Sequence, residues 1–314
     1  MAEASIPVDL FSPGQVFASL GFLEAADVLL GDAEGRFDWT DESPARFCLR
    51  AAGNENPFAV VLKFLAEARV RRCAPVGYAD PDRRQAGSSI DDHGDDLRHA
   101  VAPGDLRYSD SFPDREGSRM ALPIELESSH GLVIPLGHWA DGSNRNAFKL
   151  YAGNRSAYSI ACAMLRGTFE KSTKKRPAGE ARTRGVVALW EQQQMDLIAR
   201  PFDVLTPIGG SFNFDPRGGW TALDAGYSPD EHHAIAASPV VEILAAWGLE
   251  HARPDEYRTR KVRYGVWSAR LPPMLARPAL AGVSVAGPVR VFQFALNLSG
   301  KNKVVTSAQE ETNA

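Results

Sequence analysis

The first thirty residues predict a strand followed immediately by a long helix, and this pair restricts the folds that the chain can adopt. Apolar and other residues alternate over residues 5–10, as in a strand with one buried face. Ser12, Pro13 and Gly14 then combine a capping residue with a proline at the first helical position. Because apolar residues continue at largely helical spacing as far as Gly31, we expect a helix over residues 13–30.

Two short strands and a second helix follow, and together they complete most of a known supersecondary unit. The strands are predicted at residues 36–39 and 46–50, and the helix begins at Asn56-Pro57. The order strand, helix, strand, strand, helix matches the first five elements of the ferredoxin-like βαββαβ unit, and residues 121–126 can supply its last strand. The expected fold class is therefore α+β, with a ferredoxin-like (RRM-like) core, large inserted loops, and additional C-terminal strands and a helix.

A long acidic segment, at about residues 76–120, separates that last strand from the other five elements. Between residues 80 and 116 the segment contains ten acidic and five arginine side chains, with little apolar periodicity. We therefore expect an inserted loop. Its aspartates and histidines have no regular ligand spacing, so we expect no metal site there and no cofactor. These residues are Asp91, Asp92, His93, Asp95, Asp96 and His99.

The remainder of the chain predicts a second α+β part over residues 136–300, after a first part over residues 1–135. Its expected helices run from an N-cap at Asn154 to Gly167, over residues 186–199 and over residues 240–248. Two strands of similar length are expected at residues 258–269 and 289–298. The second of these should be central in its sheet or well covered, because both of its faces carry apolar residues. The polar residues 301–314 predict a flexible tail.

Positive charge is concentrated in one segment of an otherwise acidic chain. Residues 145–184 contain ten lysines or arginines and two acids, whereas the whole chain has a net charge of −4. The ten cations are Arg145, Lys149, Arg155, Arg166, Lys171, Lys174, Lys175, Arg176, Arg182 and Arg184, and the last six belong to a basic loop at about residues 168–185. Such a segment suits an anionic partner, although a solvated cationic loop has the same composition.

A second cationic strip begins the strand predicted at residues 258–269. Its members are Arg258, Arg260, Lys261 and Arg263. With Ser143, Asn144 and Asn146 beside the first cations, the chain has the mixture of basic and small polar side chains that commonly holds phosphate oxygens. We therefore predict that both strips bind nucleic acid. Phe212, Phe214 and Trp220 can stack on bases, but aromatic residues in strands more often belong to the core.

Motifs of enzyme active sites are absent from the sequence. Gly209-Gly210 lacks the spacing of a dinucleotide or phosphate-binding loop, and no GxSxG nucleophile motif occurs. His138 is the one candidate general base, for an RNA-cleaving site in which Lys149 stabilises the transition state. Because no third group completes this pair, we expect no catalytic residue.

The distribution of apolar residues argues against a membrane span and against a signal peptide. The sequence has no run of 18 apolar residues, and its first residues lack the basic and apolar regions of a signal peptide. The three cysteines are far apart and form no CxxC pair. We therefore expect a cytoplasmic protein without a membrane partner, a disulfide framework or a structural zinc site.

Four stretches of the chain together resemble a known family. They are PVDLFSPGQVFASLGFLEAAD, HWADGSNRNAFKLYAGNRSAYSIACAML, GGSFNFDPRGGWTALDAGYSPDE and RYGVWSARLPPMLARPALAG. In these stretches the chain is similar to CRISPR-associated proteins of type I-U, now called I-G, and in particular to the third Csb-type protein of that subtype. The similarity covers most of the chain apart from the acidic insertion and the tail.

The resemblance implies a large-subunit-like or RAMP-related component of a Cascade-like, RNA-guided surveillance complex in antiviral defence. Such subunits commonly have ferredoxin-like folds with inserted loops, and they contact guide RNA or target DNA through the nucleic-acid backbone. The implied partners are guide RNA, target DNA or both, together with the other subunits of the ribonucleoprotein. The acidity of the whole chain departs from what extensive nucleic-acid contact requires. The resemblance carries over no catalytic residue.

Three hypotheses follow for the function. In the first, the protein is a non-catalytic subunit that binds nucleic acid through the two cationic strips. In the second, it is an endoribonuclease that processes guide RNA with His138. In the third, it is a structural assembly protein whose basic segment docks an acidic protein partner.

Overall fold

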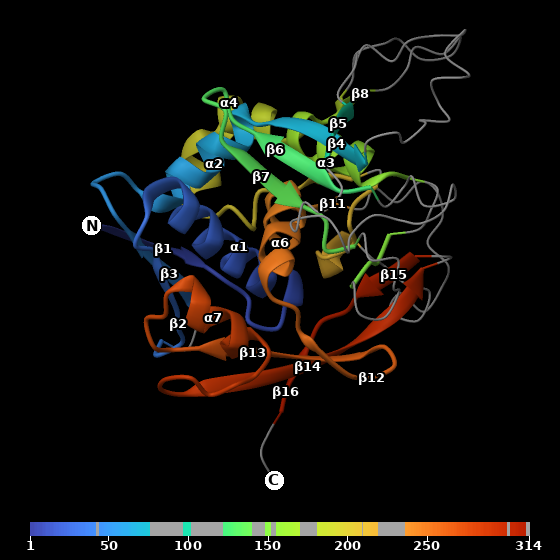
Figure 1. Ribbon diagram of the computed structural model, residues 1–314. Helices are drawn as coiled ribbons and strands as arrows, with labels where there is room; N and C mark the ends of the chain where they lie inside the picture. Colours follow the sequence, from blue (N-terminus) through green and yellow to red (C-terminus); the bar gives the residue numbers. More distant parts are fainter. Residues whose placement is uncertain are drawn as a thin grey trace, which may run out of the picture.

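The computed structural model of the protein describes residues 1–41, 44–75, 97–101, 122–139, 148–151, 155–169, 181–208, 210–218, 236–299 and 302–311. Its fold is mixed α+β with several small sheets, which are mostly antiparallel. Two helices, α1 (Pro13–Leu30) and α6 (Pro239–His251), lie in the middle of the molecule (Figure 1). One sheet lies above them in this view and the C-terminal sheet lies below. None of the described helices is long and apolar enough to cross a bilayer.

The N-terminal elements form in the predicted order. They are β1 (Ala2–Pro7), α1, β2 (Glu34–Asp38), β3 (Arg46–Ala51) and α2 (Pro57–Glu67). The three strands make an antiparallel sheet in the order β1-β3-β2. Both predicted helix starts are confirmed: Pro13 is the first residue of α1, and the side chain of Asn56 accepts a hydrogen bond from the Phe58 N–H at 3.0 Å.

The next strands form a sheet of their own. This sheet has the order β5-β4-β6-β7 and consists of β4 (Arg69–Pro75), β5 (Leu97–Val101), β6 (Ile124–Glu127) and β7 (Val133–Leu136). The strand expected at residues 121–126 is therefore present as β6, but it pairs with β4 and β7 and not with β1. Strand β5 lies within the segment expected to be an inserted loop, and the other residues of 76–120 lie outside the described part.

Close contact between α1 and α6 depends on glycine. A Cβ atom at Gly21 would lie 1.9 Å from the carbonyl oxygen of Leu244, and a Cβ at Gly248 would lie 2.4 Å from that of Phe17. Any larger residue at these two positions would push the helices apart. The face of α1 that contacts α6 is not its only buried face, because every residue from Pro13 to Ala26 is buried.

Three further helices and several short elements complete the middle of the chain. The helices are α3 (Ala157–Arg166), α4 (Val186–Ala199) and α7 (Pro273–Leu280). The short elements are β8 (Thr168–Phe169), β9 (Ala181–Thr183), β10 (Thr206–Pro207), η3 (Pro216–Gly218) and β11 (Ala236–Ala237). Helix α3 ends at Gly167 as predicted, but its N-cap is Ser156, whose hydroxyl accepts from the Ser159 N–H at 3.1 Å. Asn154, the predicted cap, lies outside the described residues.

The C-terminal sheet contains the two long strands that the sequence predicts. Its members are β12 (Asp255–Arg258), β13 (Lys261–Trp267), β14 (Val289–Ser299), β15 (Asn302–Val305) and β16 (Gln309–Glu310). As expected, β14 is central, since it pairs with β13 on one side and with β15 and β16 on the other. The structure differs from the expected flexible tail, because residues 302–305 and 309–310 form β15 and β16.

One hydrophobic core runs through both parts of the chain. Phe17 of α1 contacts the rings of Tyr264 and Phe294 from the C-terminal sheet. Two hydrogen bonds tie that sheet to the N-terminal residues: the Tyr264 hydroxyl donates to the Leu10 carbonyl at 2.6 Å, and the Trp267 indole N–H donates to the Gly35 carbonyl at 2.9 Å. The long α1 helix therefore holds the two predicted parts in contact.

Candidate nucleic-acid interface

The basic segment predicted at residues 168–185 begins and ends in a two-stranded ribbon. Strands β8 and β9 pair antiparallel, with Thr168 opposite Thr183 and Phe169 opposite Ala181. The ribbon connects the end of α3 to the start of α4. Residues 170–180, which carry Lys171, Lys174, Lys175 and Arg176, lie between the two strands in the sequence and outside the described residues.

Two glycines let the chain cross itself at the base of this ribbon. Gly167 has a φ of +85°, and a Cβ there would lie 2.4 Å from the carbonyl oxygen of Thr183. A Cβ at Gly185 would lie 2.3 Å from the nitrogen of Gly167. The backbone of Arg184 is also fixed, because its N–H donates to the hydroxyl of Thr206 at 2.8 Å. The ends of the basic segment are thus held close together by backbone contacts.

Cationic side chains of the predicted set lie beside this base. Arg166, the last residue of α3, is exposed, and Arg184 is half-buried. Neither forms an ion pair with another described residue. The side chain of Arg182, in β9, and the whole of Arg145 lie outside the described part of the chain.

The two predicted cations before α3 lie in different environments. The Lys149 ammonium group is 4.9 Å from the centre of the Tyr151 ring, and burial lowers the pKa of this lysine. Arg155 is exposed, and its guanidinium lies against the backbone of Gly210: a Cβ at that glycine would be 2.1 Å from Nη1. The Gly209-Gly210 pair of the sequence therefore makes room for Arg155 at its second residue, and Gly209 lies outside the described residues.

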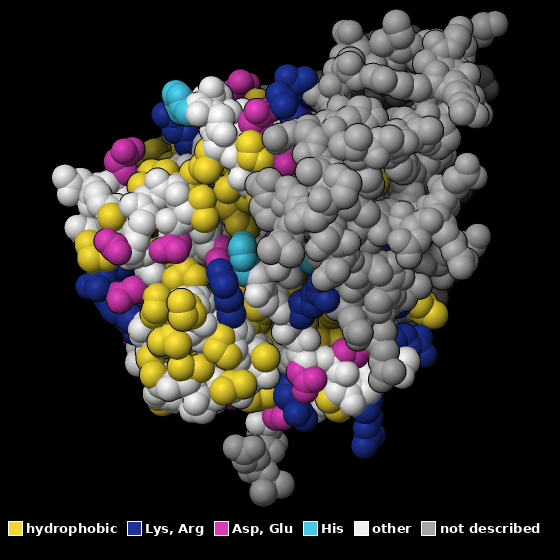
Figure 2. Space-filling view, viewed as in Figure 1, with side chains coloured by type: hydrophobic (Ala, Val, Ile, Leu, Met, Phe, Trp, Pro, Cys, Tyr) yellow, Lys and Arg dark blue, Asp and Glu magenta, His cyan; other side chains and the backbone are white. Residues whose placement is uncertain are grey.

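The second cationic strip forms the turn between β12 and β13. Arg258, Arg260 and Lys261 are exposed, and no described carboxylate pairs with them. Arg260 has a φ of +59°, and its N–H donates to the side chain of Glu256 at 2.9 Å, a hydrogen bond that stabilises the turn. Three of the four residues predicted here thus present their charge to solvent, and Figure 2 shows Lys and Arg side chains in dark blue on this side of the molecule.

Arg263, the fourth residue of the strip, has a different role. Its Nε donates to Glu311 at 2.8 Å, and its guanidinium lies 4.7 Å from the centre of the Tyr257 ring. The hydrogen bond with Glu311 raises the pKa of Arg263. Arg263 is therefore the member of the strip whose charge is already balanced within the protein, and its role in binding stays a prediction.

Strand β15 connects the second strip to the residues before α3. The Leu296 N–H donates to the Arg260 carbonyl at 2.9 Å, and Leu296 pairs with Val305 of β15. On the same strand, the Lys303 N–H donates to the Leu150 carbonyl at 2.9 Å. The β12–β13 turn and β15 lie on one side of the molecule (Figure 1). Lys303, which belongs to the segment that we expected to be a flexible tail, therefore lies between the residues before α3 and the second cationic strip.

Arginines elsewhere in the described residues are mostly paired, which sets this surface apart. Seven of them make ion pairs with carboxylates at 2.5–3.0 Å, namely Arg36, Arg50, Arg71, Arg217, Arg270, Arg277 and Arg290. By contrast, the predicted cations Lys149, Arg155, Arg166, Arg184, Arg258, Arg260 and Lys261 have no carboxylate partner among the described residues. Pairing cancels charge locally, so the unpaired cations dominate the attraction of an anion.

The aromatic residues considered for base stacking belong to the core. Phe212 and Phe214 are fully buried, and their rings stack 5.9 Å apart between centres. Phe212 also stacks on Trp139 at 5.1 Å. These two rings are therefore enclosed by protein and cannot receive a base. Trp220 lies outside the described residues.

His138 is also a core residue. Its side chain is 3% exposed and packs against Trp139 and Phe214. Burial lowers the pKa of His138 to about 3, with the nearby Arg253 charge acting in the same direction. A general base must reach its substrate, and this neutral, enclosed ring cannot. The role considered for His138 in RNA cleavage does not fit this position.

Residues 210–218 are held on the first turn of α6 by buried carboxylates. One oxygen of Glu242 accepts from the N–H groups of Phe214 and Asp215 at 3.1 and 2.9 Å. Asp215 in turn accepts from Arg217 Nε and from the Ser238 N–H, both at 2.9 Å. Burial raises the pKa of Glu242 to about 8. These bonds fix the segment that carries Gly210 and, through it, the place of Arg155.

The described residues contain neither a metal-binding cluster nor a disulfide bond. Among the described residues, no group of three or more His, Cys, Asp or Glu side chains is arranged to hold a metal ion. The cluster Asp91, Asp92, His93, Asp95, Asp96 and His99 lies largely outside those residues, and the side chain of His99 is not described. Cys48, Cys73 and Cys162 form no disulfide bond with one another.

Comparisons with known proteins return no relative. No model of a protein family matches the chain, and no curated protein matches its sequence. No solved structure matches its fold.

Proposed function

We propose that this protein is a non-catalytic subunit of a type I-U/I-G CRISPR surveillance complex and that it binds guide RNA, target DNA or both. In this role it takes part in antiviral defence in the cytoplasm, together with the other subunits of the ribonucleoprotein. The resemblance of four long stretches of sequence to the third Csb-type protein motivates the assignment to that system. The unpaired cations support nucleic-acid binding independently of the resemblance.

The N-terminal sheet supports the ferredoxin-like, RAMP-like part of the proposal. In the ferredoxin-like unit, helices follow the first and third strands, and the first three strands have the order 1-3-2. The protein has this order in β1-β3-β2, and α1 and α2 follow β1 and β3. The last strand of the unit, which would lie beside β1, has no counterpart in this sheet among the described residues.

One observation carries the proposal of nucleic-acid binding. Of the eight predicted cations whose side chains the structure describes, all but Arg263 are unpaired among the described residues, whereas most other described arginines are neutralised by carboxylates. Unpaired Lys and Arg side chains held on fixed backbone are the groups that replace counterions along a phosphate backbone. Guide-dependent complexes need this kind of contact, because base pairing and not the protein reads most of the sequence.

The two other hypotheses receive less support. An endoribonuclease based on His138 is disfavoured by the burial of that side chain. The same cations could also bind an acidic protein partner, as the assembly hypothesis requires. An experiment distinguishes this hypothesis from nucleic-acid binding. In that case the protein co-elutes with an acidic subunit in gel filtration, and treatment with nuclease leaves the complex intact.

The proposal is tested by fluorescence anisotropy with labelled RNA and DNA oligonucleotides at low salt. The variant combines Arg258→Gln, Arg260→Asn and Lys261→Gln, in which asparagine tolerates the positive φ of position 260. We expect its affinity to fall about tenfold or more, since each phosphate contact adds to binding. Equal affinity of the variant and the wild type for both nucleic acids would refute a role for this turn.

A further inference from the structure

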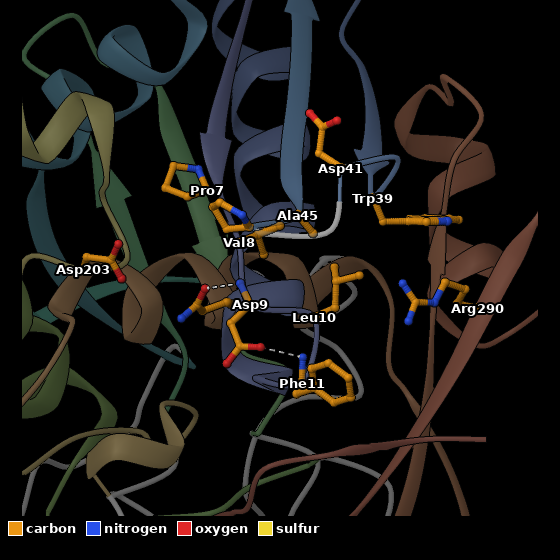
Figure 3. A pocket seen from close by; sticks show the side chains of 12 residues that line it. Pro7, Val8, Asp9, Leu10, Phe11, Trp39, Asp41, Ala45, Asp203 and Arg290 are labelled. Carbon is orange, nitrogen blue, oxygen red and sulfur yellow. Dashed lines mark hydrogen bonds between the residues drawn. The ribbon is translucent and has the colours of Figure 1, made fainter. Parts of the chain in front are cut away.

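A cavity whose lining contains none of the predicted nucleic-acid-binding cations is suited to a different kind of ligand. It has a volume of about 620 Å³, which is within the range of ligand-binding pockets. The connection from β1 to α1 forms its floor, and it is bounded by the end of β2, the start of β3, Asp203 after α4 and Arg290 of β14. Figure 3 shows Asp203 on the opposite side of the cavity from Trp39 and Arg290, with Asp9 between them.

Negative charge predominates at this cavity. Asp9, Asp41 and Asp203 are exposed at its rim. Asp203 is 3.9 Å from its nearest cation, the Nη1 atom of Arg217, and the other two make no ion pair with a described residue. Arg290, the one cation among the described residues of the lining, is already bound by both oxygens of Glu310, with Nε at 2.6 Å from Oε1. A phosphate group would therefore be repelled.

The lining also offers aromatic surface and a free amide donor. Trp39 already accommodates a cation, because the Arg290 guanidinium lies 5.6 Å from the centre of its ring. Phe11 adds a second, 46% exposed ring. Gln15 is 6% exposed: its Oε1 accepts from the Asp9 N–H at 2.8 Å, and no described residue accepts from its Nε2. This amide belongs to a side chain of the cavity lining, so a ligand in the cavity can supply the acceptor that no described residue provides.

We propose that this cavity binds an arginine or lysine side chain presented by a segment of a partner protein. The carboxylates of Asp9, Asp41 and Asp203 attract the cation, and its aliphatic stem packs on Trp39 and Phe11. A carbonyl of the partner's backbone accepts from Nε2 of Gln15. The site thus selects a basic peptide and excludes nucleic acid, so it divides the surface of the protein between two kinds of partner. The inference does not depend on nucleic-acid binding elsewhere.

The test uses the blocked pentapeptide acetyl-Gly-Gly-Arg-Gly-Gly-amide as the probe. Binding is followed by the indole signal of Trp39 in a proton–nitrogen correlation spectrum, which a Trp39→Phe variant assigns. The same peptide with citrulline in place of arginine removes the charge and keeps the shape. Adenosine monophosphate serves as the nucleotide probe.

We expect the arginine peptide to shift the Trp39 signal saturably and with millimolar affinity, and the citrulline peptide to bind at least threefold more weakly. Asp9→Asn keeps the acceptor for the Phe11 N–H, and Asp203→Asn lies at an exposed position, so both variants should fold, as circular dichroism would verify. Each should weaken the arginine peptide about two- to fivefold. Asp196→Asn, which removes an exposed carboxylate outside the cavity, should have no effect. Equal binding of the citrulline peptide, binding of the nucleotide instead, or no response to any probe would overturn the proposal.

Discussion

The guanidinium of Arg155 lies against the backbone of Gly210, so that a Cβ atom added at this glycine would be 2.1 Å from Nη1 of the arginine. This contact joins the start of α3 to the segment that Glu242 holds on α6. Because the atoms met at position 210 are the end of a flexible side chain, a larger residue there would move the Arg155 guanidinium and leave the backbone in place. An exposed arginine that is held in one place loses less entropy when it binds a phosphate.

The contact between Arg155 and Gly210 predicts a coupling between two variants. Gly210→Ala should displace the flexible end of Arg155 and weaken binding of a labelled RNA by nearly as much as Arg155→Ala does. Because both changes remove the same placed charge, the double variant should bind about as well as either single one. Arg166→Ala is the control, since its effect should add to that of Gly210→Ala. Additive effects of Arg155→Ala and Gly210→Ala in the anisotropy titration would show that the contact is irrelevant to binding.

Because α1 and α6 cross so closely, adding a single methyl group at Gly21 should greatly lower the stability of the protein. In Gly21→Ala the new Cβ would lie 1.9 Å from the Leu244 carbonyl oxygen, so the helices must separate. We expect a loss of about 3 kcal/mol or more in the free energy of unfolding, measured with urea. Gly53→Ala is the matched control: it meets no atom within 4 Å, and its φ of +86° alone should cost about 1–2 kcal/mol. Similar losses in the two variants would contradict this account of the crossing.

The buried carboxyl group of Glu242 predicts a fall in stability with rising pH. Its pKa is raised to about 8 in the folded protein from an ordinary value of 4.5, so the folded state holds a proton that the unfolded state has lost between these values. Stability from this group is complete below pH 4.5 and is lost as the pH rises to about 8, with a slope of up to about 1.4 kcal/mol per pH unit.

Glu242→Gln keeps an oxygen for the N–H groups of Phe214 and Asp215 but cannot ionise. Urea unfolding from pH 5 to pH 9 should therefore show a variant that loses less stability than the wild type as the pH rises. Parallel curves for the two proteins would mean that the carboxyl group titrates normally.

Two neighbouring arginines of the second strip should respond oppositely to substitution. Arg263→Gln breaks the ion pair with Glu311 and the contact with Tyr257, so it should cost about 1 kcal/mol of stability and leave nucleic-acid affinity almost unchanged. Arg260→Asn should leave stability unchanged and weaken nucleic-acid binding. Thermal unfolding and anisotropy, measured on both variants, distinguish these outcomes. A large loss of affinity in Arg263→Gln would show that it is a binding residue.

Local signals in the sequence were sufficient for most helices and for the long strands. Helix α1 has its predicted bounds, because the Ser-Pro-Gly start and the Gly31 stop are contained in the chain itself. The cap of α3 was misplaced by two residues, since Asn154 and Ser156 are both good caps and only the folded helix chooses between them. Strands β15 and β16 were missed because they are short and polar and are stabilised by pairing with β14.

The sequence was sufficient to predict which segments carry the cations of the candidate site, but not the long-range contacts that these side chains make. The basic segment and the second strip are visible in the sequence as clusters of charge. Nothing local indicates that Arg263 pairs with Glu311, 48 residues later, or that His138 is enclosed by aromatic rings. The acidic cavity was missed for the same reason, because its lining comes from segments as far apart as Asp9 and Arg290.

We propose that the cations of the basic segment replace counterions on nucleic acid. The salt dependence of binding tests this proposal, in a variant in which Lys174, Lys175 and Arg176, which lie outside the described residues, are replaced by alanine. A control variant replaces Arg46, Lys63 and Arg200, three exposed cations elsewhere on the surface, and so has the same net charge.

A filter-binding titration over a range of salt concentrations gives the slope of the logarithm of the binding constant against that of salt. Each lost phosphate contact should reduce the slope by about 0.9 on duplex DNA or about 0.7 on a single strand. We predict a reduction of about 2 to 3 for the basic-segment variant on duplex DNA and no reduction for the control. An unchanged slope in the basic-segment variant, or an equal reduction in both variants, would contradict the claim.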